Sequence, residues 1–112
     1  MQSILQSIKK LLGISSEDTS FYQDIIMHIN SVFSVLTQLG VGPEEGFYIE
    51  NDYALWTDFM DEGAKLESIK SYVYLKVKLM FDPPLSSTVI ESINRTISEL
   101  EWRINLDAES TS

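Results

Sequence analysis

Cysteine is absent from the sequence, and histidine occurs only once. Without cysteine the chain has no disulfide, no thiolate nucleophile and no cysteine-ligated zinc. A zinc site normally uses three or four protein ligands, so a single histidine without cysteine does not indicate a zinc site. No apolar run approaches the roughly 20 residues of a membrane-spanning helix, and no segment resembles a signal peptide. We therefore expect a protein without metal or cofactor, made in the cytoplasm and not bound to a membrane.

Basic residues are also scarce, since eight lysines and arginines face 17 aspartates and glutamates, for a net charge of −9. Most of this charge lies in one segment. Residues 44–67 contain eight acidic residues against one lysine, which is a net charge of −7. Such a surface repels phosphate groups, so nucleic-acid binding by charge neutralisation is not expected. A protein that DNA passes without being gripped remains compatible with this charge.

Long helices are expected between the few glycines and prolines. A chain of 112 residues with 44% hydrophobic residues is one domain with a real core. Apolar residues recur at helical spacing in segments 4–12, 21–39, 66–80 and 89–104. The run from Ser15 to Ser20 offers cap residues for the second helix. Asn51 and Asp52 could cap a short helix that runs through Leu55 to Met60.

The fold class predicted from these segments is all-α, a small bundle of about four helices plus a short one. Residues 41–53 form a long loop. The helical domain covers residues 1–107, and residues 108–112 form a flexible polar tail, with the chain expected to be loose from Asn105 onward. One segment is ambiguous, because residues 73–79 alternate apolar and polar residues as a strand would. Helix is favoured, since the apolar stripe begins seven residues earlier and has no turn signal.

No group of residues predicts catalysis. His28 lies beside the apolar stripe of the second helix, with Asp24 one turn before it, and is expected to be a half-buried boundary residue. The glycines of residues 39–47 lack the spacing of phosphate-binding loops. The carboxylates of residues 44–67 lack the pattern of a calcium loop, and we interpret them as solvated. We expect that the protein is not an enzyme.

Five aromatic residues crowd into the acidic segment: Phe47, Tyr48, Tyr53, Trp56 and Phe59. They could cover the core of their own domain, or they could anchor a neighbouring protein as aromatic hot spots do. Trp102 lies off the apolar stripe of the last helix and could likewise serve a partner. The third long helix is apolar over a wide arc, so it is either central to the core or shared with another subunit.

Four segments together resemble the phage head–tail connector proteins, also called adaptor or head-completion proteins. They are IKKLLGI (8–14), HINSVFSVLTQLGVGPEEGF (28–47), YVYLKVKLMFDPP (72–84) and ELEWRINL (99–106). The resemblance covers about residues 1–107 and rests on the order of the segments, since none is diagnostic alone. It implies a helical subunit that forms a homo-oligomeric, dodecameric ring below the portal of a phage head. The ring extends the DNA channel, joins head to tail, and belongs to a virion made in the cytoplasm of a bacterial host.

The resemblance also implies partners: the portal protein, and a tail-side completion or tail protein. Candidate portal contacts lie near the C-terminus: Trp102, Arg103, Ile104, Asn105, Leu106 and Asp107. The loop at 41–53 and the five aromatics are candidate subunit or tail contacts, with a face of the third long helix as part of the complementary patch. DNA would pass through the channel without specific binding. The alternatives are an intracellular adaptor that binds a single protein outside any virion, and an enzyme that uses carboxylates of residues 44–62.

Overall fold

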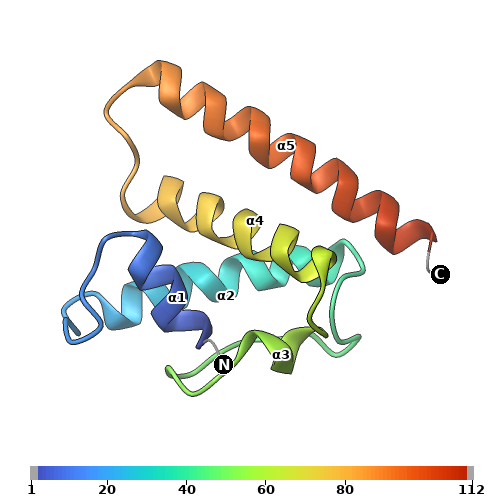
Figure 1. Ribbon diagram of the computed structural model, residues 1–112, viewed down its shortest axis with the longest axis horizontal. Coiled ribbons are helices and arrows are strands. Elements are labelled where there is room, and N and C mark those ends of the chain that lie inside the picture. The colour runs from blue at the N-terminus through green and yellow to red at the C-terminus, as the bar shows by residue number, and fades with distance from the viewer. Residues whose placement is uncertain (1–2, 111–112) are drawn as a thin grey trace.

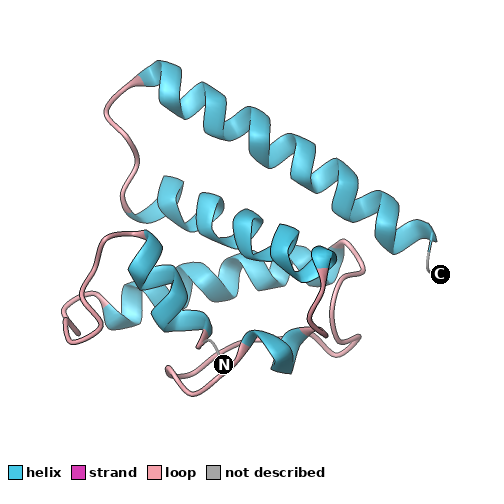
Figure 2. Ribbon diagram, viewed as in Figure 1, coloured by secondary structure: helices cyan, strands magenta, loops and turns pink. Residues whose placement is uncertain are grey.

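A computed structural model describes residues 3–110 and, for residues 109 and 110, the backbone alone. Its helices are α1 (Ile4–Leu11), α2 (Tyr22–Gln38), α3 (Trp56–Phe59), α4 (Ala64–Phe81) and α5 (Ser87–Ser110). Figure 2 shows helices and loops, and no strand within the described residues. The predicted all-α class is confirmed. The ambiguous residues 73–79 are helical and lie inside α4, as favoured from the apolar stripe.

Helix α4 is the centre of the bundle. It packs against α2 on one side and α5 on the other, while α1 packs against α2 (Figure 1). The wide apolar arc explains this position, since a helix that is apolar over much of its surface needs neighbours on several sides. Its buried residues are Leu66, Ile69, Tyr72, Val73 and Val77. The same arc could also have indicated a helix shared between subunits, but here most of it is buried within one chain.

Helix α2 shows the predicted amphipathic pattern. Its buried residues are Ile25, Ile26, Ile29, Val32, Phe33 and Leu36, while Met27 is exposed on the polar face. The helix ends at Gln38, and Gly40 follows its C-cap residue with a φ of +80°, which lets the Val41 N–H bond back to the Leu36 carbonyl at 2.9 Å. Its start differs from the prediction. Phe21 occupies the N-cap position, and no side chain caps the helix.

The turn between α1 and α2 is held by a buried lysine. Lys9 is buried in α1, and its ammonium group donates hydrogen bonds to the carbonyls of Ser16 and Asp18 at 3.3 and 2.6 Å. Asp18 in turn accepts a hydrogen bond from the Ser20 N–H at 2.9 Å, which is the main reason that the pKa of this carboxyl is lowered. The polar residues of this segment therefore stabilise a turn instead of capping α2.

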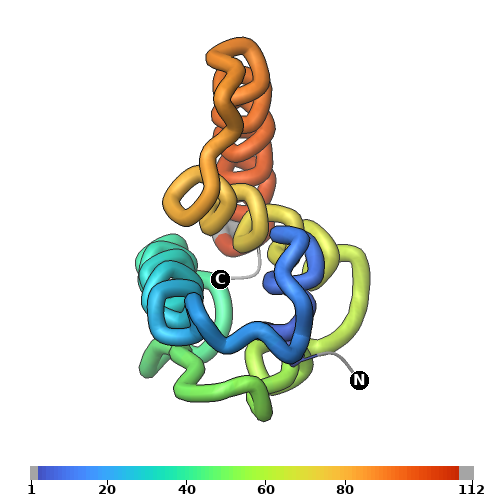
Figure 3. The backbone as a smooth tube through the Cα atoms, turned by 90° about the vertical axis from the view of Figure 1, so that its left-hand side faces the viewer, coloured from blue at the N-terminus to red at the C-terminus, as the bar shows by residue number. Residues whose placement is uncertain are grey.

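Helix α5 is anchored over only part of its length. From Ile97 onward it packs on the bundle through the buried Ile97 and Ile104, and Ala108 reaches the turn at Gly40. Its start projects from the body, as Figure 3 shows from one end of the molecule. The linker before it contains Pro83 and Pro84 and keeps α4 and α5 as separate helices.

The helix α5 continues through Asn105, where the sequence predicted the loose polar tail to begin, and ends at Ser110. Residues 111 and 112, the end of that tail, lie outside the described residues. None of the helices in the described part of the chain has an apolar stretch long enough to cross a membrane.

Candidate functional site

The five aromatics of the acidic segment separate into a buried group and an exposed pair. Trp56 and Phe59 are 2% and 4% exposed, and Phe47 is half-buried. These rings surround Phe33 of α2, with ring centroids of Phe47 and Phe59 at 4.9 and 4.8 Å from it and 5.2 Å from each other. Three of the five therefore cover the core of their own domain, the first of the two alternatives considered from the sequence.

Tyr48 and Tyr53 are the pair that faces solvent, at 67% and 83% exposure. They lie on the loop between α2 and α3, which passes along the lower edge of the molecule in Figure 1. Tyrosine is an enriched residue at the energetic centres of protein interfaces. Of the aromatics in this segment, these two are the ones whose side chains are available to a partner.

The loop that carries the tyrosines is fastened to α2 by one side chain. Asn30 donates from Nδ2 to the Ile49 carbonyl at 2.9 Å and accepts from the Ile49 N–H at 2.8 Å. Gln6 of α1 adds a hydrogen bond from its Nε2 to Asp52 Oδ2 at 3.1 Å.

The short helix α3 is not capped by the residues predicted from the sequence. Asn51 accepts a hydrogen bond from the Tyr53 N–H at 2.9 Å, and α3 begins later, at Trp56. The predicted capping of the short helix by Asn51 and Asp52 is therefore wrong. The Asp58 carboxylate accepts from the Leu55 N–H instead.

Replacing Asn30 with alanine should release this loop. The change leaves the Ile49 N–H and carbonyl without their partner, and an unsatisfied buried backbone group costs about 1–3 kcal/mol. We expect faster amide hydrogen exchange at Ile49 and a free energy of unfolding lower by about 1–3 kcal/mol in urea titration. Asn94→Ala, at an exposed position on α5, is the control and should leave both quantities nearly unchanged. Equal exchange at Ile49 in the Asn30 variant and the parent would contradict the proposed clamp.

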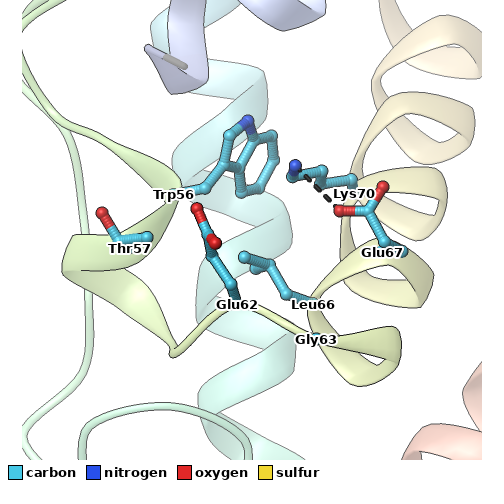
Figure 4. A pocket seen from close by; sticks show the side chains of 7 residues that line it. All are labelled: Trp56, Thr57, Glu62, Gly63, Leu66, Glu67 and Lys70. Atoms are coloured by element: carbon cyan, nitrogen blue, oxygen red, sulfur yellow. Dashed lines mark ion pairs between the residues drawn. The ribbon is translucent and has the colours of Figure 1, made fainter. Parts of the chain in front are cut away.

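A pocket of about 400 Å³ lies between α3 and the start of α4. Figure 4 shows its lining residues, which are Trp56, Thr57, Glu62, Gly63, Leu66, Glu67 and Lys70. Lys70 pairs with Glu67 at 2.9 Å, and its Nζ atom lies 6.0 Å from the centre of the Trp56 ring. The indole N–H of Trp56 donates to Ser7 Oγ at 2.8 Å. These contacts join α1, α3 and α4, so the polar groups of the pocket serve the packing of the bundle.

The described residues, 3–110, bring few metal-binding side chains together. No group of three or more histidine, cysteine, aspartate or glutamate side chains that could hold a metal ion is present there. His28 is half-buried as predicted, with its ring centre 6.4 Å from that of Phe81. Asp24 is exposed one turn before it.

The candidate portal contacts form the exposed end of α5, with one exception. Trp102 is 64% exposed, and Arg103, Asn105, Leu106 and Asp107 are also exposed. Arg103 pairs with Glu99 one turn earlier on the same helix. Ile104 is buried against the bundle. The residues from Trp102 to Asp107 therefore present a mostly polar surface around one large aromatic side chain.

The joint between α4 and α5 contains a buried tyrosine. The Tyr72 side chain is fully buried in α4, and its hydroxyl makes no hydrogen bond of ordinary geometry. Burial and, second, the negative charge of the nearby Glu101 on α5 raise the pKa of the Tyr72 phenol well above its usual value. The phenol consequently stays neutral, as a group in the middle of an apolar helix contact should.

One exposed apolar region was missed by reasoning from the sequence. Met80, Leu85 and Val89 are exposed where α4 ends and α5 begins. The sequence pattern places Val89 at the start of the apolar stripe of the last helix, where burial is expected. The signal that could have revealed the region is Leu85, an apolar residue placed between two prolines and the cap serines of the next helix.

Comparison with protein families shows that the chain matches the family described as "Phage connector protein" over residues 4–111. Comparison with curated proteins and with solved structures gave no match. The family match covers nearly the entire chain, including all of the helices described above.

Proposed function

Because the chain belongs to the phage connector protein family, we propose that it is a structural subunit of the head–tail junction of a tailed phage. In this role, copies of the chain form a ring below the portal, extend the DNA channel and complete the head. The ring is dodecameric by resemblance to the head–tail connectors. The observation that carries the proposal is the family match over residues 4–111, which takes in the whole helical domain.

The distribution of charge supports a channel through which DNA slides. A subunit with a net charge of −9 repels the phosphate backbone at short range, so a ring of such subunits would not hold DNA in place. The segment of residues 44–67 supplies most of that repulsion. DNA is then cargo that passes the ring, and specific nucleic-acid binding is not part of the function.

Surface side chains support contacts with head and tail proteins. The exposed end of α5 around Trp102 is the proposed portal contact, since aromatic side chains with a polar rim are typical anchors of protein interfaces. The loop that carries Tyr48 and Tyr53 is the proposed contact for a neighbouring subunit or a tail protein. We propose that the protein acts by assembly, without enzymatic activity, and that it resides in the virion after synthesis in the host cytoplasm.

The proposal is tested by removing the protein from the phage that encodes it. A stop codon in place of the Lys10 codon should give DNA-filled heads without attached tails, seen by electron microscopy, and infectivity should fall to background. Supplying the normal gene from a plasmid should restore tailed particles. Electron cryomicroscopy of the restored particles should show a ring of helical subunits between portal and tail.

Two results would overturn the proposal. One is a normal yield of tailed, infectious particles from the stop-codon phage. The other is recovery of the tagged protein in a one-to-one complex with a cellular protein and never in particles, which is the outcome expected of an intracellular adaptor.

A further inference from the structure

Helix α5 has the smallest share of buried residues among the helices described. From residue 87 to residue 108 only Ile97 and Ile104 are buried, whereas α2 has six buried residues and α4 has five. The start of α5 stands away from the body in both Figure 1 and Figure 3. The linker of residues 82–86 before it is mostly exposed, so it does not fix the helix in one position. A segment with so few buried contacts moves as a unit at little cost to the rest of the fold.

A groove lies between α4 and the part of α5 that diverges from it. Its volume is about 450 Å³, and residues of both helices line it, among them Lys76, Leu79, Met80, Asn94, Ile97 and Glu101. Ile90 and Ile93, which continue the apolar stripe of α5 toward its start, are only half-buried. The two helices run in opposite directions (Figure 1), so the start of α5 has the end of α4 as its neighbour. If α5 lay along α4 over its full length, apolar side chains of both helices would fill the groove.

A buried hydroxyl without a partner lies beside this groove. The Tyr72 side chain is fully buried in α4, and its hydroxyl makes no hydrogen bond of ordinary geometry. Lys76, which lines the groove, has its Nζ atom 5.8 Å from the centre of the Tyr72 ring. Nearly all buried polar groups of folded proteins are hydrogen-bonded, because an unpartnered one is destabilising. The position of α5 in this structure therefore leaves one polar group of α4 unsatisfied.

Glu101 of α5 offers the acceptor that Tyr72 lacks. It stands on the buried side of the helix, four residues after Ile97 and three before Ile104, and is itself half-buried. Its carboxylate is near enough to the Tyr72 hydroxyl to add to the effect of burial, which raises the pKa of the phenol. A small displacement of α5 toward α4 would complete a hydrogen bond from the hydroxyl to the carboxylate, and such charge-assisted bonds are strong.

We propose that α5 is a hinged strap that occupies two positions in the free chain. One is the open position of this structure. In the other, closed position the start of α5 lies along the end of α4, the groove is filled, and the Tyr72 hydroxyl donates to Glu101. The hinge is the part of α5 that Ile97 and Ile104 anchor. Desolvation of the carboxylate opposes closure, whereas the hydrogen bond and the apolar contacts favour it, so both positions are populated. This inference goes beyond the proposed function and does not depend on it.

The absence of cysteine allows spin labels to be attached at two chosen positions. Met27→Cys places a nitroxide on the exposed face of α2, and Val89→Cys places one near the start of α5. Since α4 lies between α2 and α5, closure shortens the distance between the labels. A tilt of about 20° at Ile97 moves Val89, about 12 Å away along the helix, by about 4 Å. Double electron–electron resonance on the purified chain should show two distances, separated by about that amount.

A matched pair of labels reports on the anchored part of α5. Met27→Cys combined with Asn105→Cys keeps the label on α2 and moves the other to an exposed position beside the buried Ile104. Because this part of the helix is the hinge, the pair should show a single distance. A single distance in both pairs would overturn the proposal. Two distances in both would show that α5 moves as a whole, which contradicts a hinge at Ile97.

Tyr72→Phe, introduced into the chain labelled at positions 27 and 89, tests the hydrogen bond. The closed position loses a bond, while the open position loses only an unpartnered group. The ratio of the closed to the open population should therefore fall about tenfold. Tyr74→Phe removes a hydroxyl from the other side of α4 and should leave the ratio unchanged.

Urea unfolding of the unlabelled Tyr72→Phe chain gives a second, independent measurement. Its midpoint should lie below that of the parent, whereas removal of a hydroxyl that is never bonded would leave the midpoint equal or raise it. An unchanged population ratio, or a midpoint at or above that of the parent, would refute the bond between Tyr72 and Glu101. Any of these failures would leave the head–tail role untouched, because that role is tested in phage particles.

Discussion

Phe33→Ala is expected to lower the free energy of unfolding by about 3–5 kcal/mol, the usual cost of deleting a large buried aromatic side chain. Phe33 is fully buried, and the rings of Phe47 and Phe59 lie within 5 Å of its own. Removing it leaves a cavity between α2, the loop after it and α3. Since a domain of this size is stable by about 5–15 kcal/mol in total, the loss should be visible as a large shift of the urea midpoint.

Met27→Ala provides the control on the same helix. Met27 is exposed on the polar face of α2, and surface substitutions of this kind usually change stability by less than about 0.5 kcal/mol. Urea titrations of the two variants and the parent, followed by circular dichroism, measure the difference. If the free energy of unfolding of Phe33→Ala lay within about 1 kcal/mol of that of the parent, the aromatic cluster would not be the core of this end of the bundle.

Gly42→Ala is expected to destabilise the protein by about 2–5 kcal/mol, for two separate reasons. The φ of Gly42 is +87°, a conformation that costs any residue with a Cβ atom about 1–2 kcal/mol. An added Cβ atom would also overlap the Phe59 ring, lying 2.8 Å from Cζ and closer still to Cε1. Phe59 cannot retreat easily, because its ring is packed between Phe33 and Phe47.

Gly13→Ala isolates the backbone contribution. Gly13 has a similar φ of +81°, but an added Cβ atom there meets no atom within 4 Å. The free energy of unfolding of this variant should fall only by the cost of the positive φ, about 1–2 kcal/mol. The difference between the two alanine variants, measured by urea titration, is the steric cost at Phe59. Equal losses in the two variants would mean that the ring moves aside at no cost.

Long amphipathic helices were predictable from this sequence because their signals are local. The stripe of α2 repeats over five turns, and the glycine at its end allows the positive φ that stops a helix. The seven residues of α4 that alternate like a strand were correctly assigned, since the apolar stripe extends on both sides of them. In both helices the apolar pattern within the 17 or 18 residues of the helix itself is enough to predict the helical conformation.

The positions of the aromatics were not predictable in the same way. Trp56 and Tyr53 are three residues apart in one acidic segment, yet the first is buried and the second exposed. What separates them is the path of the loop, which Asn30 fixes from 19 positions away in the sequence. The exposed start of α5 has a similar cause, since its stripe is buried only where α4 runs beside it. Contacts between distant segments decide both cases, and no local pattern encodes them.

Helix α5 is held at one end and free at the other, so it is mechanically a lever. Its buried anchors begin at Ile97, ten residues after its first residue, Ser87. Those ten residues rise about 15 Å, so a tilt of about 10° at the anchor moves the tip by about 3 Å. The exposed side chains of Leu85 and Val89 at that tip can therefore shift relative to the rest of the bundle while the core remains unchanged.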